Sequence, residues 1–389
     1  MYEIPLEILD LFLEYLHLDR DRHALGSCSL VCQAWLPVAR RHFLSDVTVK
    51  FSTCDADQVL QGLLSSPLCT IAPYIHNLHI QGTCPALPPA MVQAALAAIR
   101  RLPNIHNVTL QDMTWPLVPV ELRSMIASYD LTSISFSFVF FTTSHELYQL
   151  LSSFPALTAL SMGYGIRWME RNPDTTFRLD PTPTATPPSK RLTSVRKLSV
   201  DTSKEPLMSF LLQLTAPASI DALEMRFVSI PQKLLVDEFL NRTTLKHLTL
   251  DFGKIGQGPG TIHFDLGSHT QLRSLTLEGL ILSRSYYTSP KMTWAACMAL
   301  LSTVKSRNLE LLTICLLNLK SVADVDWTMF EGVLEGSAFA TLKTVVLRLN
   351  VFADSEPGTS HAEAIRASLP KANARRLLEF EHVQHPQQV

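Results

Sequence analysis

The side chains best suited to metal chemistry are those of His76, His79 and Cys84. Imidazole and thiolate groups are the usual ligands of Zn²⁺, and a tetrahedral site needs them to converge on one point. His76 and His79 flank Leu78 in a segment that we expect to be a β-strand. Residues three apart on a strand point to opposite faces. The spacing therefore predicts no metal site at this position.

The glycines Gly253, Gly256, Gly258 and Gly260 form the one segment with a composition suited to phosphate binding. Their order is not G-x-G-x-x-G, and no Lys-Ser/Thr pair follows them, so a turn that closes a repeat is favoured over a phosphate cradle. The chain also lacks the G-x-S-x-G and H-E-x-x-H motifs of hydrolases and metalloproteases. We therefore expect a protein that is not an enzyme and that needs no cofactor.

The overall composition predicts a folded intracellular protein. The 389 residues are 47% hydrophobic and 17% charged, which is enough apolar material for a large core. The formal net charge of −2 gives no basic excess for a phosphate backbone, so nucleic acid is not expected as a partner. The seven cysteines contain no C-x-x-C pair, and no apolar stretch is long enough to cross a bilayer. We expect a cytoplasmic or nuclear location and no membrane partner.

An apolar-x-x-apolar-x-apolar pattern recurs through most of the chain, as in Leu245-x-x-Leu248-x-Leu250. The copies begin at Leu44, Ile75, Ile105, Leu131, Leu157, Val195, Ile220, Leu245, Leu272, Leu309 and Leu342. The alternating end of each copy predicts a short strand with one buried face, and segments with apolar residues at three-to-four spacing predict helices between the strands. One strand and one helix cannot bury their own apolar faces, so the units must stack.

These repeats resemble the irregular leucine-rich-repeat family. A regular repeat of that family has Asn or Cys at its ninth position, whereas only one copy here has it, at Asn350. The expected fold class is α/β, with residues 46–389 as a solenoid, or horseshoe, whose parallel strands line the concave face. Residues 171–191 hold Pro173, Pro181, Pro183, Pro187 and Pro188, and this composition predicts a surface insertion of the solenoid.

Residues 1–45 have a different pattern, which predicts two or three short helices. Pro5 suits the first turn of a helix, and the apolar residues from Ile8 to Leu16 occupy most of the circumference of the helix that follows. Such a helix must be covered on two sides, by its own module and by something else. Leu16, Leu25, Cys28 and Leu30 are expected in the interior of the module.

This segment resembles an F-box. The resemblance rests on Ile4-Pro5-x-Glu7-Ile8, on Phe12-Leu13-x-x-Leu16 and on Leu30-Val31-Cys32-x-x-Trp35. The segment is most similar in pattern to members of the expanded fungal F-box families. It implies a three-helix module that docks on the Skp-type adaptor of a Skp–cullin–F-box ubiquitin ligase. The adaptor contacts that it implies are Pro5, Leu6, Ile8, Leu9, Phe12, Leu13, Val31, Cys32 and Trp35.

The order of a docking module and a repeat domain leads to one main hypothesis and two alternatives. In the first, the chain is the substrate-recognition subunit of such a ligase, linked through the adaptor to a cullin, and the repeats bind a target protein. In the second, it is a leucine-rich-repeat interaction scaffold without a role in a ligase. In the third, it is an enzyme with a site that the sequence does not reveal. Candidate target contacts are the outward residues Lys246, His247, Arg273, Glu278 and Arg348. Ordinary solvated sheet surface is the alternative for each of them.

Overall fold

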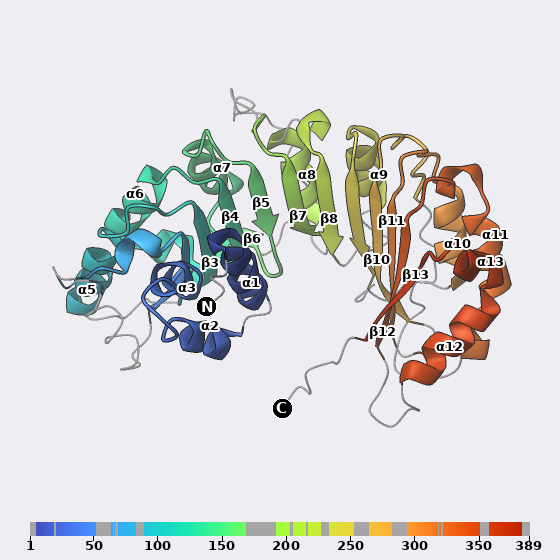
Figure 1. Cartoon of the computed structure of the whole chain (residues 1–389). Coiled ribbons are helices and arrows are strands. Elements are labelled where there is room, and N and C mark those ends of the chain that lie inside the picture. The colour runs from blue at the N-terminus through green and yellow to red at the C-terminus, as the bar shows by residue number, and fades with distance from the viewer. Residues whose placement is uncertain are drawn as a thin grey trace, which may run out of the picture. The chain divides into compact units, whose positions relative to one another are not determined.

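The structure is a computed structural model, and the chain divides into two compact units, Met1–Thr176 (unit 1) and Phe177–Val389 (unit 2). The structure describes residues 5–18, 21–51, 64, 66, 69–82, 89–168, 192–202, 205–214, 217–226, 233–252, 264–281, 294–317, 319, 322–350 and 358–382. Both units combine helices with a parallel sheet (Figure 1).

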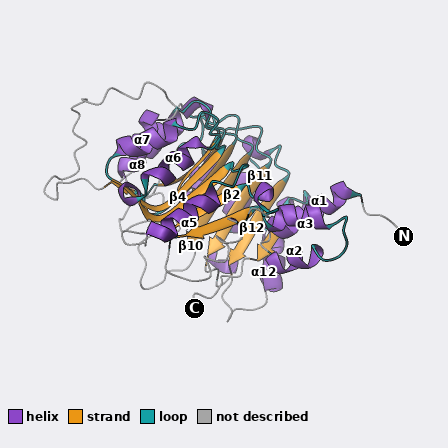
Figure 2. Ribbon diagram, turned by 90° about the vertical axis from the view of Figure 1, so that its left-hand side faces the viewer, coloured by secondary structure: helices purple, strands orange, loops and turns teal. Residues whose placement is uncertain are grey.

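Unit 1 begins with three helices that pack on one another, α1 (Leu6–Leu18), α2 (Arg22–Cys28) and α3 (Leu36–Phe43) (Figure 2). Asp21 starts α2, because its carboxylate accepts a hydrogen bond of 2.9 Å from the backbone N–H of Ala24. Pro37 stands in the first turn of α3, where its missing N–H costs no helical hydrogen bond. We call these three helices the helical module. The predicted domain boundary after residue 45 falls between α3 and the first strand, and it stays a prediction.

The strands of unit 1 follow one another in chain order and run parallel. They are β1 (Asp46–Lys50), β2 (Asn77–Gln81), β3 (Asn107–Thr114), β4 (Ser133–Phe141) and β5 (Ala159–Met162), and the short β6 (Arg167–Trp168) pairs with the end of β4. The helices that follow strands are α5 (Pro89–Ile99), α6 (Val120–Ser128) and α7 (Ser144–Ser152). Crossovers between adjacent parallel strands are right-handed, which places these helices on the same face of the sheet (Figure 1).

Unit 2 repeats the same plan. Its parallel strands are β7 (Lys197–Asp201), β8 (Ala222–Arg226), β9 (His247–Asp251), β10 (Ser274–Ile281), β11 (Leu311–Leu317), β12 (Thr344–Asn350) and β13 (Leu378–His382). Its helices are α8 (Glu205–Leu214), α9 (Lys233–Asn241), α10 (Trp294–Ser302), α11 (Trp327–Leu334), α12 (Gly358–Ser368) and α13 (Pro370–Ala374).

Burial alternates along the strands as the repeat pattern predicts. On β9, Leu248 and Leu250 are buried under the helices, whereas His247 and Thr249 point to the other face and stay accessible. We call this second face of the unit 2 sheet its helix-free face. Because one face is buried, a shift of one residue would expose every apolar side chain, which fixes the register between neighbouring strands.

All eleven copies of the repeat pattern lead into a strand, so the prediction of parallel strands alternating with helices is confirmed for the described residues. The pattern did not reveal β6, α6, α12, α13 or β13. The insertion predicted at 171–191, the glycine-rich segment from Gly253 to Gly260, and Cys84 lie outside the described residues. The horseshoe curvature with a concave strand face stays a prediction. No helix among the described residues combines the length and the apolar character that a bilayer span needs.

Two neighbouring strands of unit 1 share an uncommon backbone feature. Asp112 on β3 and Phe138 on β4 have φ angles of 53° and 52°, a region that bulky L-residues rarely adopt. The strand register places both residues at the same position, between the pairs formed by Gln111 with Ser137 and by Met113 with Val139. The left-handed turn directs the Phe138 side chain to solvent, where it packs edge-on against Tyr164 at 5.2 Å.

Candidate functional site

Helix α1 carries two different apolar faces. One face, with Leu9 and Leu13, forms the core of the helical module together with Leu25 and Ala39. The exposed apolar residues of α1 are Leu6 (57% exposed), Ile8 (56%), Leu11 (63%), Phe12 (49%) and Tyr15 (63%). Ile8, Leu11, Phe12 and Tyr15 are three or four residues apart and therefore share one side of the helix. We call these four residues the α1 outer face, whereas Leu6, three residues before Leu9, lies on the other side of the helix and is exposed in its first turn.

A second group of exposed apolar side chains lies in the turn between α2 and α3. Leu30 is 85% exposed and Val31 is 59% exposed, and the Cys32 side chain beside them is also exposed. Trp35 is partly buried and packs against the module core. A small module with this much exposed apolar surface is typical of a protein that binds a partner.

The structure corrects several sequence-based assignments in the module. Leu9 and Leu13, predicted as adaptor contacts, are interior residues, because their side chains fill the core between the three helices. Leu30, predicted as interior, is exposed. Leu11 and Tyr15 belong to the α1 outer face and were missed, although their spacing from Ile8 could have identified them. Pro5, Leu6, Ile8, Phe12, Val31 and Cys32 are exposed, and their role as contacts stays a prediction.

Polar contacts hold the helices of the module together. Asp10 on α1 forms an ion pair with Arg41, and its Oδ1 lies 2.7 Å from Nε2 of His42 on α3. The hydrogen bonds from His42 and Arg41 hold the pKa of the Asp10 carboxyl below its ordinary value. These contacts fix α1 against α3, so that the α1 outer face is presented by a rigid helix.

Asp46, the first residue of β1, links the module to the sheet of unit 1. Its carboxylate accepts hydrogen bonds from Asn77 Nδ2 at 2.6 Å and from Ser45 Oγ at 3.0 Å. His17 Nε2 on α1 and His79 Nε2 on β2 lie 3.7 and 3.8 Å from it. Burial raises the pKa of Asp46, but the hydrogen bonds from His79, Asn77 and Ser45 outweigh it and lower the pKa to about 2.

The predicted target contacts lie on the sheet of unit 2. Lys246 and Arg273 directly precede β9 and β10, and His247 starts β9. Glu278 and Arg348 lie near the other end of the strands, where Arg348 Nη1 is 3.6 Å from Glu278 Oε1. The structure therefore places the five residues on neighbouring strands of one sheet, but at its two opposite ends.

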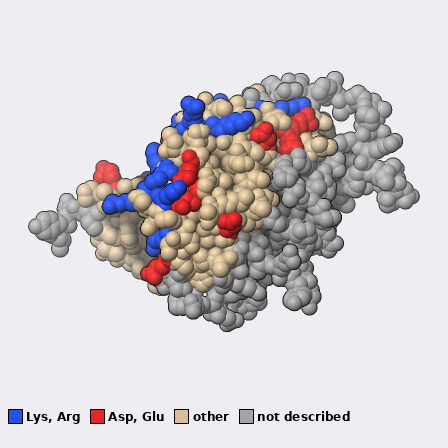
Figure 3. Space-filling view, turned by 90° about the vertical axis from the view of Figure 1, so that its right-hand side faces the viewer, with Lys and Arg blue, Asp and Glu red and all other residues tan. Residues whose placement is uncertain are grey.

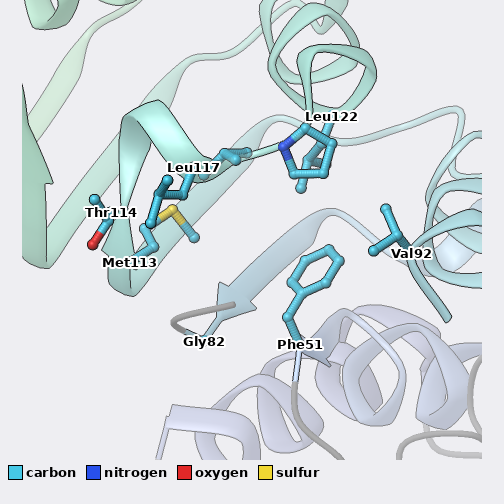
Figure 4. A pocket seen from close by; sticks show the side chains of 9 residues that line it. Phe51, Gly82, Val92, Met113, Thr114, Leu117 and Leu122 are labelled. Atoms are coloured by element: carbon cyan, nitrogen blue, oxygen red, sulfur yellow. The ribbon is translucent and has the colours of Figure 1, made fainter. Parts of the chain in front are cut away.

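Unit 1 also contains a pair of stacked histidines and an apolar pocket. The ring of His76 stacks on that of His106 at 6.0 Å, and among the described residues no group of three His, Cys, Asp or Glu side chains could hold a metal ion. The pocket lies among Phe51, Val92, Met113, Leu117 and Leu122 (Figure 4). None of its described lining residues is ionisable, so it can accommodate an apolar side chain but supplies no group for proton transfer.

No protein-family model matches the chain, and no curated protein matches it. Among solved structures, it is similar to a Bacteroides fragilis protein (10% identity, 87% of this chain and 75% of that chain covered, TM-score 0.33). It is also similar to the Rad7–Elc1 complex of yeast (14% identity, 91% of this chain and 86% of that chain covered, TM-score 0.39). A third similar structure is a leucine-rich-repeat protein of Leptospira interrogans (13% identity, 83% of this chain and 94% of that chain covered, TM-score 0.20). At these TM-scores, the assignment of the chain to the mixed α/β repeat proteins rests on its own strand order and register.

Proposed function

We propose that the chain is the substrate-recognition subunit of a Skp–cullin–F-box type ubiquitin ligase. In this proposal the helical module docks on a Skp-type adaptor, and the repeats bind a target protein. The chain itself carries out no chemistry. It raises the effective concentration of the target near the ubiquitin-charged enzyme, and this accelerates the transfer of ubiquitin to the target without any new catalytic group.

The observation that carries the proposal is the α1 outer face. A helix of a monomeric protein has no reason to expose four large apolar residues on one side when its opposite side already fills a core. Removing one such side chain from water contributes about 1.5–3 kcal/mol. The exposed face and the F-box resemblance concern the same helix, and the resemblance names a Skp-type adaptor as the partner that would cover it.

The target side of the proposal rests on the helix-free face of unit 2. This face holds short side chains such as Thr249 and Thr276 in its middle and charged side chains at its ends. Its backbone is fixed by parallel pairing on both sides of each inner strand, so its side chains are held at constant spacing of about 4.8 Å between strands. A rigid, polar and accessible sheet face of this kind suits the recognition of a protein segment.

The experiment that tests the proposal is a binding titration of the purified chain with a purified Skp-type adaptor. Ile8→Asp and Phe12→Asp each place a charge on the α1 outer face without touching the core, so both should fold and both should bind at least about tenfold more weakly. Leu234→Asp is the matched control, because Leu234 is an 81% exposed leucine on helix α9 of unit 2. It should leave adaptor binding unchanged.

Two results contradict the proposal. One is the absence of adaptor binding by the wild-type chain at micromolar concentrations. The other is equal binding by wild type, the two α1 variants and the Leu234→Asp control, since the α1 outer face would then play no part. Either result leaves the alternative, an interaction scaffold that uses its repeats without a ligase.

A further inference from the structure

The sheet of unit 2 carries opposite charges at its two ends. At the ends where the strands begin, basic residues outnumber acidic ones. The basic residues there are Arg196, Lys197, Lys246, Arg273 and Lys343, and the acidic ones are Asp221 and Glu310. Because the strands are parallel and in register, residues that are far apart in the chain form one continuous row across the starts of the strands.

Toward the ends of the same strands, acidic residues are in excess. Among the described residues of this row, the acidic ones are Asp201, Asp251, Glu278 and Glu381, and the basic ones are Arg226 and Arg348. The register places Asp251 directly between Arg226 and Glu278. Two carboxylates in adjacent register positions repel each other. Consistent with this, burial and the charge of Asp251 raise the pKa of Glu278, with only partial compensation from Arg348.

Ion pairs compensate part of the charge in each row. In the basic row, Lys246 pairs with Asp221 at 2.9 Å and Lys343 with Glu310 at 2.8 Å. Arg273, just before β10, has no ion pair within 4 Å among the described residues, and neither have Arg196 and Lys197 at the start of β7. At the other end, Glu278 shares Arg348 with Glu381, which binds that guanidinium more closely, at 2.6 Å.

The space between the two rows holds side chains of several kinds. Thr249 and Thr276 are partly accessible in the middle of β9 and β10, and Thr313 on β11 is buried. Glu224 on β8 is in register with Thr249, and His247 and Leu311 are in register with Ser274 nearer the strand starts. Arg273 and Glu278 are five residues apart, which is about 17 Å along a strand. A peptide segment lying across the strands is about 10–12 Å wide as a helix with its side chains, which leaves about 5–7 Å in total for the side chains of the two rows to span.

The helix-covered side of unit 2 has a different charge distribution. Figure 3 faces the side on which α11 and α13 lie in Figure 1, and there basic and acidic side chains are interspersed. Lys371 and Glu335 form an ion pair on this side. The separation of charge into two opposite rows is therefore a property of the strands and of the residues that directly precede them.

We propose that the helix-free face of unit 2 binds a target segment that lies across the strands and has opposite charges on its two flanks. Its acidic flank lies over the strand starts, near Arg273, and its basic flank lies over the strand ends, near Asp251 and Glu278. This inference rests on the proposed function for the role of the target and adds the chemistry that selects it. The two rows also fix the direction in which the segment binds, because turning it around brings like charges together.

The test uses two synthetic helical peptides of equal composition and measures their binding to the full chain by fluorescence anisotropy. The bipolar peptide has Glu along one flank and Arg along the opposite flank, and the scrambled peptide has both residues mixed on each flank. The wild-type chain should bind the bipolar peptide about tenfold more tightly, and the difference should shrink as salt rises.

Two charge-swap variants locate the binding. Arg273→Glu combined with Glu278→Arg reverses the ends of β10 and should abolish the preference for the bipolar peptide. Glu335→Lys combined with Lys371→Glu swaps the ion pair on the helix-covered side and should leave the preference intact. Equal binding of the two peptides by wild type, no binding of either, or an unchanged preference in the β10 swap each overturns the inference. Adaptor binding, measured separately, tests the proposed function without involving these residues.

Discussion

Nε2 of His42 on α3 lies 2.7 Å from Oδ1 of Asp10 on α1, and the Arg41 guanidinium pairs with the same oxygen. These contacts join the helix that carries the exposed apolar face to the helix that leads into the first strand. We call the contacts of Asp10 with Arg41 and His42 the polar clasp. The small core and this clasp together hold the three helices of the module against one another.

The first prediction concerns this clasp. Asp10→Asn removes the charge that Arg41 and His42 share, and it should lower the free energy of unfolding by about 0.5–1 kcal/mol, since the groups are partly exposed and screened by solvent. Urea unfolding at pH 7 measures the change. The matched control is Glu238→Gln, which removes the partner of Arg242 on the surface of α9 and should change stability less. A larger loss of unfolding free energy in Glu238→Gln than in Asp10→Asn would contradict a stabilising role of these contacts.

The second prediction concerns Asp46 and acid. Its pKa of about 2 lies below the ordinary 3.8, so its charged form stabilises the folded state above pH 4, and this contribution disappears as the pH falls from about 4 to 2. The shift corresponds to about 2 kcal/mol, which partial exposure of the side chain reduces to about 1 kcal/mol. The stability difference between wild type and Asp46→Asn that is measured at pH 5 should shrink as the pH falls below 4. A difference that grows in acid would contradict the assignment.

The third prediction separates the two faces of α1. Leu13 is fully buried, and Leu13→Ala should lower the free energy of unfolding by about 2–5 kcal/mol because it leaves a cavity. Phe12, the next residue, is exposed, and Phe12→Ala should change stability by less than about 0.5 kcal/mol while it weakens adaptor binding. Urea unfolding and adaptor titration of both variants check this. The reverse order of stability effects would mean that α1 is rotated from the orientation described.

The fourth prediction uses cysteines as probes. Cys32 is exposed, whereas Cys297 is buried, and burial raises the pKa of the Cys297 thiol to about 12. A thiol-alkylating reagent at pH 8 should modify Cys32 in the native chain and Cys297 only after unfolding, as read by mass spectrometry of peptides. Adaptor should slow the alkylation of Cys32 if this residue is a contact. Unchanged alkylation of Cys32 in the complex would remove it from the docking surface.

The strands could be predicted from the sequence because their burial follows a strict alternation, and each copy of the repeat pattern leads into one. β13 was missed for a specific reason. Leu378 and Phe380 pair in register with Val345 and Leu347, but Arg375 stands where the other copies have their first apolar residue, and Leu377 takes over the buried position. The positive φ angles of Asp112 and Phe138 were not predicted either, because the repeat pattern ends before these residues.

The docking surface was only partly predictable. Apolar residues surround most of α1, so periodicity alone could not tell which side would meet α2 and α3, and Leu9 and Leu13 were placed on the wrong side. Leu30 was misjudged because the turn between α2 and α3 has no periodicity to read. The charge rows of unit 2 require the register of strands. Arg348 and Glu381 are 33 residues apart in the chain and become neighbours only when β12 and β13 pair.

The central claim is that a Skp-type adaptor covers the α1 outer face. Hydrogen–deuterium exchange of the full chain, alone and saturated with purified adaptor, tests it most directly, because it reports binding and its location in one measurement. The account predicts slower exchange in residues 5–18 and 29–36 and unchanged exchange in the strands of unit 2. Saturated binding with no protection in residues 5–18, or no binding at all, would contradict it.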